Sequence, residues 1–198
     1  MEKRGKFIVI EGLDGCGKTT QVELLAEELR EQGEKVIETN EPTGGLIGKL
    51  IRQVLEKKAV LSSDALQLLF VADRLDHLRN EIEPTLKRGE MVICDRYLWS
   101  TVAYGSLNLD KNWLLSLHRY CSYPDISIFL EVEPKTCLQR IGLRGKGKTI
   151  FEEEGKLRKV WQVYQWLAEK FPKRVIIVDG EREPEKISRE ILNKILNL

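Results

Sequence analysis

Short apolar runs alternate with stretches of helical periodicity along the chain. Five apolar runs lie at residues 7–10, 36–39, 91–94, 126–131 and 175–179, and four of them are short and β-branched. Such runs are typical of strands that helices cover on both faces. The helices are predicted to begin near Thr19, Gly48, Ser63, Thr101, Trp113, Pro134, Phe151 and Glu183. This order predicts an α/β fold, with a five-stranded parallel sheet between two layers of helices.

The composition suits one globular domain spanning residues 1–198, since 42% of the residues are hydrophobic and 32% are charged. The net charge of +1 gives no reason to expect a nucleic acid polymer or a membrane surface as a partner. No apolar stretch approaches the ~20 residues that cross a bilayer. The N-terminal pattern is not that of a secretory signal, because only four apolar residues precede Glu11. We therefore expect a cytoplasmic protein.

The four cysteines, Cys16, Cys94, Cys121 and Cys137, lie far apart and form no C-x-x-C pair. This spacing argues against a zinc site and against a disulfide scaffold. Cys94 and Cys137 stand in apolar surroundings, where we expect small buried side chains.

The first apolar run leads directly into a phosphate-binding pattern. Residues 11–20 read EGLDGCGKTT, which contains G-x-x-x-x-G-K-[ST] between a predicted strand and a predicted helix. In such a loop the backbone N–H groups surround phosphate oxygens, the lysine reaches the outer phosphates and the hydroxyl after it binds Mg²⁺. We expect ATP to contact Gly12, Leu13, Asp14, Gly15, Cys16, Gly17, Lys18, Thr19 and Thr20. The alternative, a glycine-rich turn before an ordinary helix, leaves the Lys-Thr-Thr run unexplained.

Asp95 and Arg96 follow the third apolar run, MVIC. Ligands of an open parallel sheet bind beyond the carboxyl ends of its strands, so both residues are expected near the phosphate-binding loop. There Asp95, together with Thr19, would hold Mg²⁺, and Arg96 would bind a second phosphate. The alternative is an Asp-Arg surface pair at the end of a strand.

The segment 62–82 is predicted to be one long helix. Spacing alone favours a core position for Phe70, although Phe70 and Arg74 are i, i+4 neighbours that could stack on a base and bind its edge. His77 and His118 have no partners in the sequence and are expected to be structural. The turn-rich segment 39–49 ends a strand, so Glu41 and Pro42 could shape a substrate pocket, although turn chemistry alone also explains Pro42.

The stretch GLRGKGK, at residues 142–148, is basic, rich in glycine and the least core-like part of the chain. We interpret residues 141–150 as a short basic lid over phosphates rather than as a solvated loop. A lid would bring Arg140 and Arg144 to the transferred phosphoryl group after the substrates bind.

Several of these stretches together resemble the thymidylate kinases, the P-loop kinases that convert dTMP to dTDP with ATP and Mg²⁺. The matching stretches are FIVIEGLDGCGKTTQ (7–21), TNEPTGGLIGKLIR (39–52), LLFVADRLDHL (68–78), DRYLWSTVAYG (95–105), PDISIFLEVEP (124–134) and FEEEGKLRKVWQVY (151–164). The resemblance spans nearly the whole chain and implies a three-layer α/β/α P-loop kinase fold with a short lid. It also implies a homodimer packed through helices that include the one with Phe70.

The resemblance implies roles for single residues. Asp14 would bind the deoxyribose 3′-hydroxyl, Phe70 would stack on thymine and Arg74 would hydrogen-bond the base. Arg96 would hold the phosphate of dTMP, with Tyr97 and Tyr104 beside the sugar and the base. Catalysis would rest on Lys18, Asp95, Arg96, Arg140 and Arg144, with Mg²⁺ held by Thr19 and Asp95.

Two departures from the family pattern lie on the acceptor side. Asn40 stands where the family's T-R-E-P loop has an arginine, with Lys49 and Arg52 as candidates for the missing charge. Gly105 stands where the family's A-Y-Q-G has a glutamine. These departures keep open a kinase for another pyrimidine nucleotide such as dUMP, or for a deoxynucleoside such as thymidine. A GTPase-type switch would need an N-K-x-D motif, which the sequence lacks, and a non-catalytic P-loop protein is disfavoured by the intact Lys18, Thr19 and Asp95.

Overall fold

The sheet of this computed structural model, which describes residues 4–143 and 153–196, has five parallel strands. They are β1 (Phe7–Gly12), β2 (Val36–Asn40), β3 (Met91–Asp95), β4 (Ile126–Glu131) and β5 (Val175–Asp179), in the order β2-β3-β1-β4-β5. The five predicted strands are confirmed. The first three extend one or two residues further, because parallel pairing continues through the polar residues at their carboxyl ends, as in the pairing of Asn40 with Asp95.

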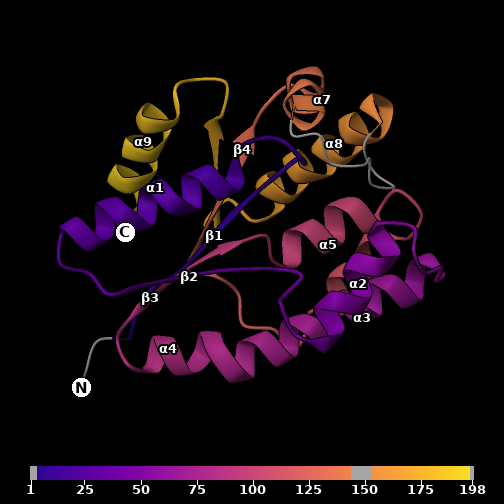
Figure 1. Cartoon of the computed structure of the whole chain (residues 1–198), viewed down its shortest axis with the longest axis horizontal. Helices are drawn as coiled ribbons and strands as arrows, with labels where there is room; N and C mark the ends of the chain where they lie inside the picture. The colour runs from indigo at the N-terminus through magenta and orange to yellow at the C-terminus, as the bar shows by residue number, and fades with distance from the viewer. Residues whose placement is uncertain (1–3, 144–152, 197–198) are drawn as a thin grey trace.

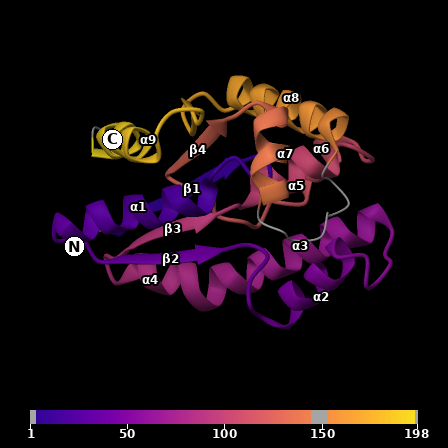
Figure 2. The same ribbon diagram turned by 45° about the horizontal axis from the view of Figure 1, so that its top comes forward.

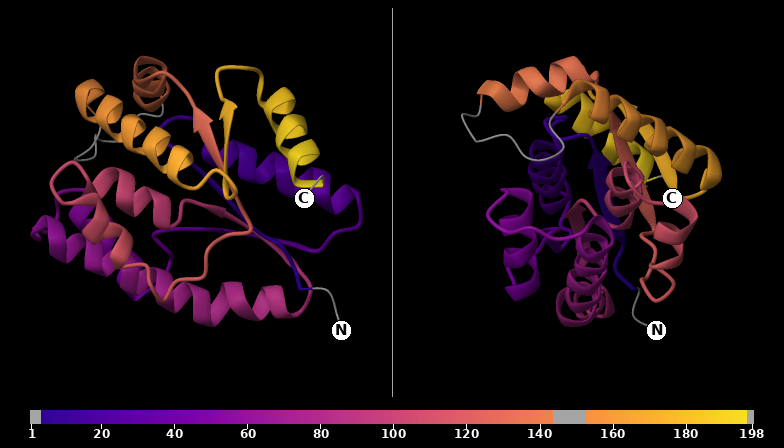
Figure 3. Two further views of the ribbon diagram at one scale, coloured as in Figure 1. Left: turned by 180° about the vertical axis from the view of Figure 1, so that it is seen from behind. Right: turned by 90° about the vertical axis from the view of Figure 1, so that its right-hand side faces the viewer.

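Helices cover both faces of the sheet and confirm the predicted three layers (Figure 1). The helices are α1 (Lys18–Glu31), α2 (Leu46–Leu55), α3 (Ser63–His77), a π-helical turn η1 (Leu78–Ile82), α4 (Glu83–Lys87), α5 (Leu98–Gly105), α6 (Lys111–Ser116), α7 (Pro134–Leu143), α8 (Glu154–Lys170) and α9 (Pro184–Leu196). On one face α1 and α9 lie side by side, and on the other α5 packs beside α8 (Figure 3). The helices α2 and α3 form a pair beyond the carboxyl ends of β2 and β3 (Figure 2).

Four helices begin earlier than predicted, α1 by a single residue. α2 begins two residues before Gly48, α5 three residues before Thr101 and α6 two residues before Trp113. In α6 the side chain of Asp110 accepts from the N–H groups of Asn112 and Trp113 at 3.0 and 2.8 Å, which fixes the start of that helix. The predicted start at Phe151 lies outside the described residues.

The helix predicted over 62–82 continues to Lys87 through η1. The wider turn lies directly before Pro84, which has no N–H to donate to a helical hydrogen bond. The elements α3, η1 and α4 therefore form one long helix along the edge of the molecule (Figure 1).

The central strand β1 is completely buried between the two helical layers, as its unbroken apolar run FIVI predicts. Cys16, Cys94, Cys121 and Cys137 are all buried free thiols, in agreement with the expectation that they form no disulfide scaffold. Among the described residues, no helix is both long and apolar enough to cross a membrane.

Candidate active site

The phosphate-binding loop connects β1 to α1 and lies directly beneath α7. A side chain at Gly15 would place its Cβ 2.4 Å from the carbonyl oxygen of Cys137 in α7, and Gly15 has a φ of +83°, so only glycine fits there. Leu13 and Cys16 turn their side chains into the core. Lys18 is 6% exposed, and its Nζ donates to the carbonyl oxygen of Leu13 at 2.8 Å. The ammonium group therefore lies over the loop that would hold phosphates.

Thr19 and Asp95 meet at the carboxyl end of the sheet. The Thr19 hydroxyl donates to Asp95 Oδ2 over 2.7 Å, although 76 residues separate them in sequence. A hydroxyl and a carboxylate are hard oxygen donors of the kind that Mg²⁺ prefers. Both residues line a cleft of about 460 Å³ beside Lys18. This donor set fits a magnesium ion.

Arg96 joins this cleft to a second pocket. Its backbone has a φ of +70°, a costly conformation for a residue with a side chain and one often found at functional sites. The guanidinium forms an ion pair with Asp14 and donates to the Gly12 carbonyl at 3.2 Å. Burial raises the pKa of Asp14, but Arg96 and Lys18 outweigh it, so the net pKa is lowered and the carboxylate stays ionised. Asp14 also offers its N–H to the Tyr104 hydroxyl at 2.9 Å.

Glu11, for which the sequence suggested no role, is linked to Arg96 through the hydroxyl of Ser100. Its carboxylate is completely buried and accepts from the backbone N–H groups of Tyr97 and Ser100, at 2.9 and 3.1 Å. Burial raises the pKa of this carboxyl group. The Ser100 hydroxyl donates to Glu11 and accepts from Arg96 Nη1 at 2.9 Å. Glu11 therefore holds the first turn of α5, and through it the arginine; a carboxylate in a fully buried strand is the sequence signal that could have found it.

The second pocket lies between α3, α5 and the loop after β2. Its lining includes all eight residues that the sequence analysis assigned to the substrate: Asp14, Glu41, Pro42, Phe70, Arg74, Arg96, Tyr97 and Tyr104. Phe70 is half-buried, packs against the small apolar cluster of Ile51, Val54 and Leu66, and also lines the pocket. Both expectations for Phe70, core position and pocket position, therefore describe part of its surroundings.

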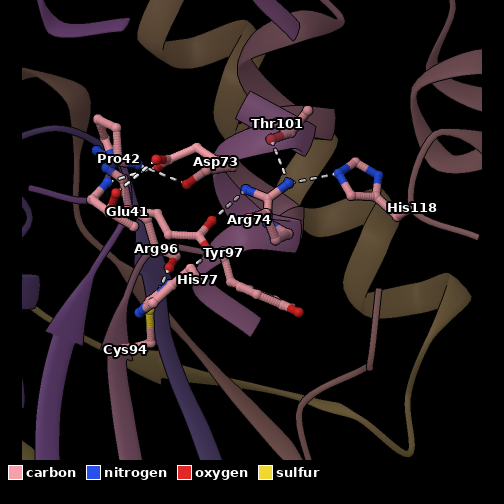
Figure 4. A network of polar contacts seen from close by, with 12 residues as sticks. Glu41, Pro42, Asp73, Arg74, His77, Cys94, Arg96, Tyr97, Thr101 and His118 are labelled. Carbon is pink, nitrogen blue, oxygen red and sulfur yellow. Dashed lines mark hydrogen bonds and ion pairs between the residues drawn. The ribbon is translucent and has the colours of Figure 1, made fainter. Parts of the chain in front are cut away.

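Arg74 lies within a network of polar contacts in this pocket (Figure 4). It is 1% exposed, and its Nη2 lies 2.7 Å from Glu41 Oε2. Its Nη1 donates to the Thr101 hydroxyl at 3.0 Å and contacts His118 Nε2 at 2.7 Å. Burial alone would lower the pKa of Arg74, but Glu41 and the other groups around the guanidinium together outweigh burial, and the net pKa is raised. The guanidinium is thus a fixed positive charge.

The two histidines hold this network in place, as the expectation of structural roles for them required. His118 contacts the Leu114 carbonyl through Nδ1 at 2.9 Å, so Nδ1 carries the proton and Nε2 accepts from Arg74. Burial and the charge of Arg74 lower the pKa of His118 to about 3, which keeps the ring neutral. His77 Nδ1 lies 3.1 Å from Glu41 Oε1, on the side of the carboxylate away from Arg74 (Figure 4).

Asp73, which the sequence did not single out, ties down the loop after β2. Its two carboxylate oxygens accept from the N–H and the hydroxyl of Thr43, both at 2.7 Å. The Glu41–Pro42 peptide bond in this loop is cis.

Comparison with known proteins agrees with this geometry. The sequence pattern of the family described as thymidylate kinase matches residues 10–191. A probable thymidylate kinase of Pyrococcus horikoshii is 45% identical over 181 residues, which are 88% of each chain. This chain belongs to the thymidylate kinase family. A probable thymidylate kinase of Methanocaldococcus jannaschii is 40% identical over 97% of this chain and 96% of its own, and a putative one of Treponema pallidum is 34% identical over 96% and 94%.

Arg140 of α7 lies beside the phosphate-binding loop. Its Nη1 donates to the Cys16 carbonyl of the phosphate-binding loop at 3.4 Å, and its Nη2 lies 3.8 Å from Glu181. Residues 141–143 of the predicted lid form the end of α7. Arg144 and the rest of the lid lie outside the described residues.

The structure shows the surroundings of Asn40 and Gly105, the two residues that depart from the family pattern. Asn40 lines the phosphate cleft and donates to the Pro42 carbonyl at 3.0 Å. Arg52 donates to the carbonyls of Pro42 and Thr43, both at 2.8 Å, so that its charge holds the loop, and Lys49 is exposed. Gly105 is closely packed, because a Cβ there would lie 2.9 Å from both δ-methyl groups of Leu114, so that the leucine side chain would have to shift.

Proposed function

We propose that this member of the thymidylate kinase family phosphorylates dTMP to dTDP with ATP and Mg²⁺. The observation that carries the proposal is the junction of two pockets: Asp14, Glu41 and Arg96 line both the phosphate cleft and the pocket with Phe70 and Arg74. A nucleoside triphosphate in the first pocket and a nucleoside monophosphate in the second would bring their phosphates together beside Arg96. That proximity is the main requirement of phosphoryl transfer.

The catalytic groups we assign are all positively charged or metal-binding. Lys18 would contact the outer phosphates of ATP, Arg96 would orient the acceptor phosphate, and Arg140 and Arg144 would add charge around the moving phosphoryl group. Thr19 and Asp95 would hold Mg²⁺, which supplies further charge neutralisation when bound. The acceptor phosphate oxygen is ionised at neutral pH, so that no strong general base is needed.

In the acceptor pocket we assign thymine to the face of Phe70 and the edge of Arg74, and the deoxyribose to Asp14 and Tyr104. The ion pair between Arg74 and Glu41 supports this assignment, because it fixes the guanidinium before the base arrives. We assign Glu41 to positioning Arg74 and Pro42 to the wall of the pocket.

We further propose that the chain is a single kinase domain. We also propose that it forms a homodimer, in which two copies of the chain meet through α2 and α3. Large apolar side chains are exposed on these two helices and on the loop between them: Leu46 of α2 is 87% exposed, Leu68 of α3 is 50% exposed, and Val60 and Leu61 of the loop are 92% and 41% exposed. Exposed apolar patches of this kind mark interaction surfaces. A molar mass in solution of twice the chain mass would support this assembly, and a monomer at micromolar concentration would contradict it.

A coupled ADP-release assay tests the function with dTMP, dUMP, dCMP, UMP and thymidine as acceptors. We expect strong preference for dTMP, and loss of most of kcat in the control variant Lys18→Ala. Preference for another acceptor would support the kinase mechanism but change the assigned substrate. The residues around Asn40 and Gly105 would then be the first candidates for the cause of that preference. No turnover with any acceptor would refute the proposal.

A further inference from the structure

Gln67 of α3 is a buried amide whose carbonyl oxygen has no hydrogen-bond partner. The side chain is 3% exposed, and Oε1 is one of four buried side-chain oxygen or nitrogen atoms that lack a hydrogen-bond partner among the described residues. A buried polar atom without a hydrogen bond is unfavourable and uncommon in folded proteins, so it calls for an explanation. An incoming ligand with a donor group would supply one.

Gln67 lines the acceptor pocket together with Phe70 and Arg74. The spacing i, i+3 and i+7 places the three residues on one face of α3. Arg74 Nε is a second buried atom without a partner in the described part of the chain. The same helix face therefore carries one unsatisfied acceptor, Gln67 Oε1, and one unsatisfied donor, Arg74 Nε, with the ring of Phe70 between them in sequence.

The Gln67 carboxamide lies close against Gly105. A Cβ at Gly105 would lie 3.2 Å from Gln67 Cδ and 2.9 Å from the methyl groups of Leu114. The absence of a side chain at 105 thus leaves space for an amide that reaches across from α3. Such packing limits the side-chain entropy that Gln67 would lose when a ligand binds.

We propose that Gln67 determines base specificity by accepting a hydrogen bond from the ring N3–H of the acceptor base, while Arg74 Nε donates to a ring carbonyl next to it. This inference rests on the proposed function. Thymine and uracil carry N3–H between two carbonyl groups, whereas N3 of cytosine is an acceptor. Arg74 can only donate, so the pair selects bases with an imide edge. Because the 5-methyl group is not read, Gln67 treats dTMP and dUMP alike.

The test compares wild-type enzyme with Gln67→Met, which keeps the side-chain volume and removes the acceptor. We expect kcat/KM to fall roughly 10- to 100-fold for dTMP and equally for dUMP. The KM for ATP and the low rates with dCMP and N3-methyl-dTMP should not change. Thermal unfolding without ligand should occur at the same or a higher temperature, because an unpaired buried polar group has been removed.

Two further variants serve as controls, one that keeps the acceptor oxygen and one that makes the same substitution at an exposed position. Gln67→Glu keeps an acceptor oxygen at this place and should retain the preference for dTMP over N3-methyl-dTMP. Gln165→Met changes an exposed glutamine of α8 and should leave all of these rates unchanged.

An unchanged kcat/KM for dTMP in Gln67→Met would overturn the inference, as would an equal loss with dTMP and N3-methyl-dTMP. If the wild-type protein turns over no acceptor, the proposed function has failed, but the role of Gln67 is still decided by calorimetry of dTMP binding. Weaker binding to Gln67→Met than to wild type would then support it, and equal binding would exclude it.

Discussion

The buried ion pair between Glu41 and Arg74 supports the strongest quantitative prediction. The two side chains are 2% and 1% exposed and lie 2.7 Å apart. In the variant Glu41→Ala the guanidinium stays buried and charged, because arginine does not give up its proton in proteins. Removing one partner of such a pair costs about 3–5 kcal/mol, most of it from the charge left behind. For a chain of this size that loss corresponds to a fall in Tm of roughly 6–20 °C.

Urea denaturation followed by circular dichroism measures this loss directly. The matched control is Glu56→Ala, whose carboxylate lies 2.6 Å from Lys58 Nζ but in a pair that is 50% and 70% exposed. Water screens that pair, so we expect no resolvable change in the free energy of unfolding. If Glu41→Ala loses less than about 1 kcal/mol, or no more than the control, burial does not decide the strength of this pair and the reasoning is wrong. Kinetics add a second readout, since a displaced Arg74 should raise KM for dTMP much more than KM for ATP.

Two further predictions concern protonation and metal binding. The folded-state pKa of His118 is about 3, below the ordinary 6.5, so the stability linked to this group is lost as pH falls below about 6.5. From pH 7 to pH 5, wild type should lose about 2 kcal/mol more than His118→Asn in urea denaturation; parallel pH profiles would contradict the neutral buried ring. Asp95→Asn removes a carboxylate from the pair with Thr19 and should raise the Mg²⁺ concentration needed for half-maximal rate, and an unchanged Mg²⁺ dependence would remove Asp95 from the metal site.

The parts of the molecule that could be predicted from the sequence are those encoded by neighbouring residues. The phosphate-binding loop is continuous in sequence, and its position between β1 and α1 follows from the apolar run before it and the helix after it. The position of Asp95 beside Thr19 was also predictable, because the carboxyl ends of parallel strands meet at one edge of the sheet. The start of α5 was not, since the acceptor for its first N–H groups is Glu11, on β1.

The acceptor pocket likewise has residues that the sequence predicts and contacts that only the fold creates. Phe70 and Arg74 were recognisable because their spacing on one helix is local, and the family resemblance raised their importance. The partners that make Arg74 rigid come from the loop after β2, from α5 and from His118, which is 44 residues away. No local pattern encodes contacts at that separation, because they arise only when several elements pack around one buried charge.

Position 105, where the family pattern has a glutamine, also shows what depends on sequence and what depends on tertiary structure. Its absence at Gly105 is plain in the sequence and reads as a missing polar group. In the folded chain the carboxamide of Gln67 lies against Gly105, with its carbonyl oxygen buried and unpaired. Order of elements, loop chemistry and family membership are properties of the linear chain. Which buried polar atoms keep or lack a partner depends on the packing of α3 against α5, and that depends on the whole fold.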